Sequence, residues 1–287
     1  MHTRPFLLHA LSPLHAGTGH AADIIDLPIA RMTATGIPFM PGSSIKGVLR
    51  DARRAVDGDK TEAVFGPSGD PAAHAGALVV GDARLLALPV RSFRGTFAWT
   101  TSPLLLTLAK RDLEEPDLPI PSIAGRGARL AQKSCCTHEN RLYLEDLDLA
   151  AAESSEATAW AQRLAPLASP GDDIFTKRFV VVDDDTMAFL WETATQVDAR
   201  VRLDERTRTV APGALWLEES LPAESLLIGI LAADRSRRRG VDMTPDEVLG
   251  FALGGEEVHQ LGGKATIGRG RCRIVPVWQK EGGHDKA

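Results

Sequence analysis

A glycine-rich segment near the end of the chain has the composition of a phosphate-binding turn. Glycine has no β-carbon, so backbone N–H groups beside it can approach and hydrogen bond phosphate oxygens. Additional positive charge would come from lysine and arginine in the same stretch. The residues concerned are Gly262, Gly263, Lys264, Gly268, Arg269, Gly270 and Arg271. The alternative interpretation is a tight hairpin between two strands.

This segment does not match the two common nucleotide-binding motifs. In a P-loop, serine or threonine follows the lysine, but Ala265 follows Lys264, and Val258 stands where the first glycine is required. In the dinucleotide-binding fingerprint a helix follows the glycines, whereas residues 271–277 are typical of a strand.

A second candidate for anion binding lies at Pro41–Gly47. Apolar residues spaced by three and four, from Ile45 to Val56, predict a helix capped by a serine. Helix N-termini attract anions, and the exposed face would be basic. The residues that we expect to contact a phosphate backbone here are Ser43, Ser44, Lys46 and Arg50. The alternative is an ordinary capped helix with a solvated charged face.

The distribution of charge favours a groove rather than a uniformly basic surface. The net charge is −5, yet residues 31–54 hold five cations and one acid, and residues 261–280 hold five cations and no acid. With one tyrosine and nine phenylalanines, the chain lacks the aromatic residues that read splayed bases in many RNA-binding proteins. We therefore expect contact with the nucleic-acid backbone, independent of base sequence.

Other features narrow the class of protein. The cysteines, Cys135, Cys136 and Cys272, lack the spacing of a zinc site or a disulfide framework. No apolar stretch is long enough to span a membrane and no signal peptide is evident, so we expect a cytoplasmic protein. His15 has a side chain suited to proton transfer near neutral pH, although a histidine beside a glycine turn is more often structural.

Local patterns predict an α+β fold rather than a doubly wound sheet. We expect strands at 6–11, 77–80, 104–108, 179–182 and 271–277, helices at 155–167 and 244–254, and an extended hairpin-like arm over 199–213. The second of these helices has a capping box, formed by Thr244 and Glu247, with Pro245 at its first position.

Taken together, scattered motifs make the chain resemble the RAMP superfamily of CRISPR proteins, and within it the repeated backbone subunits of type III-B Cmr effector complexes. The motifs are Ser12–Gly19, Ile25–Arg31, Pro41–Asp51, Leu215–Pro222 and the glycine-rich turn. The resemblance extends over nearly the whole chain, and the order and spacing of the motifs carry it.

This resemblance implies a fold and an assembly. The fold is a ferredoxin-like palm, related to RNA-recognition modules, forming a single domain over residues 1–287 with a thumb hairpin inserted at about 190–222. Copies of the chain stack along a CRISPR guide RNA beside other Cmr complex subunits. The guide pairs with a single-stranded target RNA, and each thumb distorts the duplex. The target is cut beside each distortion with a divalent cation, such as Mg²⁺, present.

The resemblance also implies which residues cut. Asp26 occupies the position of the family's cleaving aspartate and would also bind the metal ion, since Mg²⁺ prefers oxygen ligands. Glu218 matches an acidic position of the thumb motif, although Glu219 is equally eligible, and His15 is a further catalytic candidate. Asp23 is a nearby alternative to Asp26. For an arbitrary loop aspartate, capping a turn would be the ordinary role.

Two other functions stay open at this point. A purely structural subunit would bind guide RNA without cutting, and Asp26 discriminates that case. A RAMP-type enzyme that processes precursor CRISPR RNA would need a catalytic histidine arrangement and activity as an isolated protein.

Overall fold

One large mixed sheet organises the molecule. The computed structural model describes residues 1–17, 25–69 and 74–277, so Asp23 lies outside the described residues. The strand order is β14-β15-β1-β13-β4-β5-β10-β6-β9-β8-β7, with β2 pairing to β4 and β3 to β13. The strands are β1 (His2–Ala10), β2 (Phe39–Met40), β3 (Leu78–Val80), β4 (Ala83–Arg91), β5 (Phe97–Thr101), β6 (Ala128–Leu130), β7 (Thr137–His138), β8 (Arg141–Leu144), β9 (Leu147–Glu153), β10 (Phe179–Val182), β13 (Leu226–Ala233), β14 (Glu257–Gln260) and β15 (Arg271–Pro276).

Helices cover both faces of this sheet. Because alternate side chains of β1 point to opposite faces, this strand contributes to the buried cluster on each side. Phe6 and Leu8 join one buried cluster with α1, α2, α6 and α7. Leu7 joins the other with α3, α4 and α5. The helices are α1 (Gly42–Arg54), α2 (Gly58–Phe65), α3 (Pro103–Leu113), α4 (Ser155–Ala168), α5 (Ile174–Arg178), α6 (Asp184–Thr193), α7 (Pro245–Ala252) and the 3-10 helix η1 (Ala265–Ile267).

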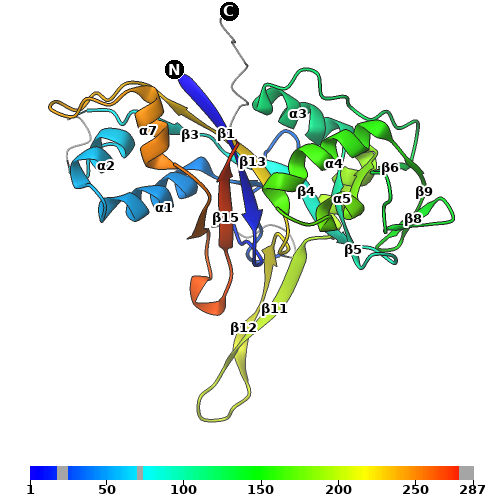
Figure 1. The fold of residues 1–287 in the computed structure, drawn as a ribbon. Helices are drawn as coiled ribbons and strands as arrows, with labels where there is room; N and C mark the ends of the chain where they lie inside the picture. The colour runs from blue at the N-terminus through cyan, green and yellow to red at the C-terminus, as the bar shows by residue number, and fades with distance from the viewer. Residues whose placement is uncertain (18–24, 70–73, 278–287) are drawn as a thin grey trace, which may run out of the picture.

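A two-stranded hairpin projects beyond one end of the central sheet. It consists of β11 (Gln196–Leu203) and β12 (Val210–Ser220), which pair with each other and with no other named strand. In Figure 1 it extends away from the central strands, with α1, α2 and α7 to one side and α3, α4 and α5 to the other. The glycine-rich turn between β14 and β15 lies near the base of the hairpin.

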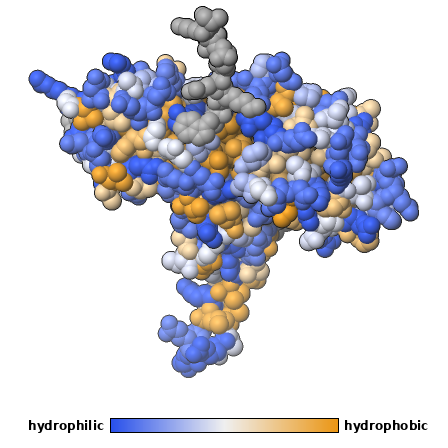
Figure 2. Space-filling view, viewed as in Figure 1, coloured by the Kyte–Doolittle hydropathy of each residue, from blue (hydrophilic) through white to orange (hydrophobic). Residues whose placement is uncertain are grey.

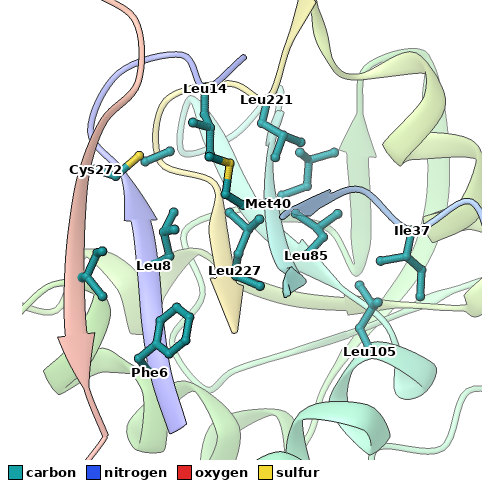
Figure 3. Close-up of a cluster of buried hydrophobic side chains, with 14 of the residues drawn as sticks. Phe6, Leu8, Leu14, Ile37, Met40, Leu85, Leu105, Leu221, Leu227 and Cys272 are labelled. Carbon is teal, nitrogen blue, oxygen red and sulfur yellow. The ribbon is translucent and has the colours of Figure 1, made fainter. Parts of the chain in front are cut away.

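The core anchors the segments that lead to the hairpin base. Leu14, in the loop after β1, and Leu221, just after β12, exchange both backbone hydrogen bonds, at 2.8 and 2.9 Å. Both side chains are fully buried in the same cluster as Phe6 and Leu8. Figure 3 shows them together above Met40. The loop after β1 and the base of the hairpin are therefore packed together as one unit.

Several elements predicted from the sequence are confirmed. The strand at 6–11 corresponds to β1, the helix at 155–167 to α4, the strand at 179–182 to β10, and the arm at 199–213 to the β11–β12 hairpin. The capping box of Thr244 and Glu247 is formed at the start of α7. Within the described part of the chain, no helix is both long and apolar enough to cross a bilayer.

Two local predictions are wrong. The apolar run 104–108 is the helix α3, which Ser102 caps by accepting the N–H of Leu105. A short apolar run does not distinguish a strand from a helix, and the Ser102-Pro103 start was the missed signal. The helix α1 has no serine cap: Pro41 is its N-cap, and Ser43 and Ser44 lie exposed in its first turn.

Candidate functional site

Asp26 lies at the base of the hairpin and its side chain is exposed. Its Oδ2 accepts the backbone N–H of Leu217 in β12 at 2.8 Å. The next residue, Leu27, forms a parallel bridge with β12: its N–H bonds the carbonyl of Leu217 at 3.1 Å, and its carbonyl accepts the N–H of Glu219 at 3.0 Å. An isolated bridge thus joins the loop to the edge of the hairpin, where the loop presents the Asp26 carboxylate.

Glu218 is buried beside this edge, and its carboxylate accepts two hydrogen bonds and forms an ion pair with Arg200. Oε1 accepts hydrogen bonds from the Nε1 of Trp216 and the Nζ of Lys264, each at 2.7 Å. The Nε of Arg200 lies 3.4 Å from Oε2. Burial alone would raise the pKa of Glu218, but the bonds from Lys264 and Trp216 outweigh it and hold that pKa below 4.5, its ordinary value. The group is a carboxylate at neutral pH and has no proton to donate.

His15 is also buried, at 7% exposure. Its Nδ1 lies 2.6 Å from the carbonyl oxygen of Glu219. A carbonyl can only accept, so Nδ1 carries the hydrogen and Nε2 is the nitrogen left to accept. The backbone of His15 supports the glycine-rich turn, since its carbonyl accepts the N–H of Gly263 at 3.0 Å.

The glycine-rich turn packs directly on His15, and this close approach explains its first glycine. Gly262 has φ +73°, and a β-carbon there would lie 2.3 Å from the carbonyl oxygen of His15. The turn joins β14 to β15, so the alternative hairpin interpretation is the one that the structure shows. Gly262 and Gly270 are needed for close backbone packing, because a β-carbon at either position would meet a carbonyl oxygen.

The expectation that amides of this turn are free to bind phosphate is wrong for three glycines. The N–H of Gly263 bonds His15, that of Gly268 bonds the carbonyl of Ala265, and that of Gly270 bonds the carbonyl of Pro13. Gly262, Gly263 and Gly268 are nevertheless exposed, whereas Gly270 is buried.

We expected Arg269 to face solvent as an RNA-binding residue, but it does not. Its side chain is buried, donates to the Oγ of Ser220 at 2.6 Å, and pairs with Asp198 of β11. It fastens the turn to the hairpin. We therefore do not expect Arg269 to contact RNA.

At α1, internal groups also occupy much of the predicted anion site. The N–H of Gly42 donates to the carboxylate of Asp82 at 2.8 Å, so the helix start already holds an anion. Lys46 donates to the carbonyl of Leu78, and burial, with a smaller effect of Arg50, lowers the pKa of Lys46. Arg50 bonds the carbonyl of Gly66 at 3.0 Å.

The partners that hold the site together were not predicted from the sequence. Glu219 accepts hydrogen bonds from four donors, and Arg31, one of the five cations of the basic segment 31–54, binds it with both terminal nitrogens. Asp198 and Ser220 hold Arg269. Such pairs join residues far apart in the chain, and no local pattern indicates them.

A metal ion would find only a partial set of ligands here. In residues 1–17, 25–69 and 74–277, no three His, Cys, Asp or Glu side chains gather as a metal site requires. Asp26 offers one exposed carboxylate at this edge. Mg²⁺ often binds through one or two carboxylates with water and substrate phosphates, so Asp26 fits that role only together with RNA.

The fold and this site define a family. The RAMP superfamily model matches residues 7–273, and the chain belongs to this superfamily, as the sequence motifs indicated. Among curated proteins it is similar to the CRISPR system Cmr endoribonuclease Cmr4 of Pyrococcus furiosus, with 33% identity over 281 residues that cover 93% of each chain.

Solved structures of Cmr proteins have a similar fold. The crystal structure of oligomeric Cmr4 from Pyrococcus furiosus matches with TM-score 0.73 and 25% identity, covering 96% of this chain and 98% of that one. A chain in the cryo-EM structure of the type III-B Cmr-beta complex bound to cognate target RNA matches with TM-score 0.74 and 21% identity, covering 96% and 97% of the two chains. The second match shows the shared fold alone.

Proposed function

We propose that this chain is a guide-RNA-binding backbone subunit of a type III-B CRISPR complex and that it cuts complementary target RNA endonucleolytically. Similarity over 93% of a named Cmr4 endoribonuclease supports the assignment. The structural observation that carries the cutting role is the exposed Asp26 carboxylate, fixed to the hairpin strand through Leu217. Its partners would be guide RNA, single-stranded target RNA, further copies of the chain in a filament and other Cmr subunits, in the cytoplasm.

The central strands support a ferredoxin-like palm. In the order β15-β1-β13-β4 every neighbouring pair is antiparallel. Along the chain these strands run β1-α1-β4 and then β13-α7-β15, and both helices pack into the same buried cluster. This strand order and these connections support the split βαβ arrangement of ferredoxin-like folds. We propose that residues 1–287 belong to a single domain, with the thumb at about 190–222.

The hairpin has the surface expected of a thumb that wedges into a duplex. Val201 and Leu215 are directly opposed, and Leu203 and Val210 form a second opposed pair beyond a register shift; all four side chains are exposed. Figure 2 shows this apolar patch on the arm, with a hydrophilic tip beyond it. Apolar side chains can enter between bases, while exposed arginines at the tip can contact phosphates. The tip arginines are Arg202, Arg206 and Arg208.

Other RNA contacts are proposed where the predicted residues are accessible. Ser43 and Ser44 on α1 and Gly262, Gly263 and Gly268 on the turn are exposed. Lys46 and Arg50 are half-buried and Lys264 is paired with Glu218, so these cations would add charge beside the strand rather than project into it. Base pairing with the guide would supply specificity for the target.

For the chemistry, the RNA supplies its own nucleophile. When the 2′-hydroxyl lines up with the adjacent phosphate, its oxygen bonds to phosphorus and its proton passes to water. The bond from phosphorus to the 5′-oxygen breaks, and this leaving oxygen takes a proton from water. The products are a cyclic phosphate and a 5′-hydroxyl. Asp26 would orient this hydroxyl and hold the divalent cation, which neutralises charge on the phosphate. Glu218 stays ionised and fixes Lys264 beside the edge, and buried His15 supports the turn beneath.

The alternative is a structural subunit that binds guide RNA without cutting. Processing of precursor RNA by the isolated chain is less well supported, because His15 is buried with Nδ1 already bonded.

The deciding experiment compares Asp26→Asn with the parent chain in a complex reconstituted with guide RNA and the other Cmr subunits. We expect target cleavage to fall at every site by at least about 100-fold, since correct placement of a reacting group is worth that much. Target affinity should stay unchanged. Chelation with EDTA should stop cleavage by the parent complex, and Mg²⁺ should restore it.

Asp51→Asn is the matched control, because Asp51 is an exposed aspartate on α1. It should cut normally. If Asp26→Asn complexes still cut at all sites, the catalytic assignment is wrong and the structural alternative stands.

A further inference from the structure

Glu219 has the densest set of bonds at the hairpin base, and its carboxylate is 1% exposed. Oε2 accepts the N–H of Ile29 at 3.0 Å and the Nη1 of Arg31 at 2.9 Å. Oε1 accepts the Nη2 of Arg31 at 2.6 Å and the Oγ1 of Thr195 at 2.8 Å. One side chain therefore joins the loop that carries Asp26 to the start of β11.

The backbone of Glu219 extends the same network. Its N–H donates to the carbonyl of Leu27 at 3.0 Å, and its carbonyl accepts the Nδ1–H of His15 at 2.6 Å. Leu27 directly follows Asp26, and Ile29 lies two positions further on. Backbone and side chain of Glu219 thus fix the segment just after Asp26, while the neighbouring Leu217 fixes the Asp26 carboxylate itself.

Glu219 cannot act on RNA directly. Its carboxylate is buried, and donors already engage both oxygens. Burial would raise the pKa of Glu219, but the bonds from Arg31, with the N–H of Ile29 and with Thr195, outweigh it and keep that pKa below 4.5, its ordinary value. The charge is permanent near neutral pH and serves to hold Arg31 and the loop.

We propose that Glu219 is a positioning residue for target cleavage: it acts through the loop and sets where the Asp26 carboxylate stands relative to the hairpin. This inference rests on the cutting role proposed for Asp26. It separates the two adjacent acids of the thumb motif, because Glu218 faces Lys264 and the glycine-rich turn, whereas Glu219 faces the Asp26 loop. Displacing a reacting group by about 1 Å can cost about 100-fold in rate.

The test compares Glu219→Gln with the parent in the reconstituted complex, under single-turnover conditions with saturating target. Glutamine keeps the shape but replaces the paired Arg31 contact with a neutral one. We expect the cleavage rate to fall on the order of 10- to 100-fold with target affinity unchanged. We also expect cleavage to spread to phosphates next to the normal sites, which loss of stability alone would not produce.

Asp112→Asn is the matched control, since Asp112 is also a buried carboxylate paired with an arginine, Arg84, but lies on α3. It should lower the melting temperature without slowing or shifting the cut. Thr195→Val removes only one hydrogen-bond donor to Glu219. This variant replaces Glu219→Gln in the experiment if Glu219→Gln does not assemble. We expect it to slow cleavage several-fold, again with affinity intact.

The outcomes separate this inference from the proposed function. If Asp26→Asn is inactive but assembled Glu219→Gln complexes cut at the normal rate and at the normal sites, the positioning role is wrong and the proposed function stands. Where Glu219→Gln does not assemble, the same result with Thr195→Val leads to the same conclusion. Normal cutting by Asp26→Asn overturns the proposed function itself, whatever Glu219 does. Equal slowing by Asp112→Asn would show a general loss of stability and would also overturn the positioning role.

Discussion

At the scale of single residues, side chains near the hairpin base differ in role according to burial. Asp26 is exposed and carries the proposed chemistry, while Glu218, Glu219 and Arg269 are buried and hold neighbouring segments in place. Buried charges that each have several hydrogen-bonding partners preserve a geometry, and removing one partner leaves the other unpaired. The backbone also preserves this geometry where Gly262 packs against the carbonyl oxygen of His15.

Gly262→Ala should destabilise the chain by about 1–3 kcal/mol, because alanine is strained at positive φ and its β-carbon would meet a carbonyl oxygen. Gly268→Ala is the control: it also has positive φ, +81°, but nothing lies within 4 Å of its added β-carbon. Denaturant unfolding of both variants measures the difference. Equal losses would show that the contact with His15 adds nothing beyond backbone strain.

At the scale of elements, the outer part of the hairpin is exposed along both of its strands. Val201 and Leu215 are 47% and 64% exposed, and they face each other across β11 and β12. Exposed apolar side chains grouped on one face mark an interaction surface. The bridge at Leu27 joins this element to the loop that carries Asp26, so it would hold the proposed wedge and the proposed cleavage residue at a fixed separation.

Replacing Val201 and Leu215 together with serine should leave folding nearly intact, costing about 1 kcal/mol or less, because both side chains are already exposed. In the assembled complex we expect slower target cleavage and less distortion of the duplex, measured by chemical probing of unstacked bases. Val56→Ser, at an apolar position 71% exposed outside the hairpin, should change neither. Normal distortion of the duplex by the variant with serine at both positions would contradict the proposed wedge role of the hairpin.

At the scale of the whole molecule, ionised carboxylates hold together segments that are far apart in the sequence. The pKa values of the buried Glu218 and Glu219 lie below 4.5, and that of the half-buried Asp183 lies below 3.8. Burial opposes the shift in each case; hydrogen bonds outweigh it, together with cations at Glu218 and Glu219. The unfolded chain therefore binds protons more readily than the folded chain as pH falls. Their contribution to stability is complete above pH 4.5 and is lost below it.

Denaturant unfolding between pH 7 and pH 3 should show this loss, with the free energy of unfolding falling as pH drops through about 4.5. Glu219→Gln should be less stable than the parent at pH 7 and should lose less on acidification, because one of the responsible groups is gone. An identical pH dependence in the two chains would show that Glu219 contributes nothing to acid sensitivity.

The sequence by itself determined the elements that short-range signals encode. The capping box at Thr244, the alternation along 199–213 and the buried run of β1 predicted their elements because hydrogen bonds and side-chain periods within a few residues specify them. The order of the motifs identified the superfamily. The run at 104–108 failed because its apolar period fits a strand and a buried helix equally well.

Only the tertiary structure decided which candidate side chains face solvent and which face one another. Asp26 meets Leu217, 191 positions away, and Arg31 meets Glu219, 188 positions away. Sequence cannot separate Glu218 from Glu219, since adjacent residues of a strand point to opposite faces and the packing of the strand decides which face meets the loop. It likewise cannot show that Arg269 turns inward, because a buried arginine depends on distant partners that satisfy its charge.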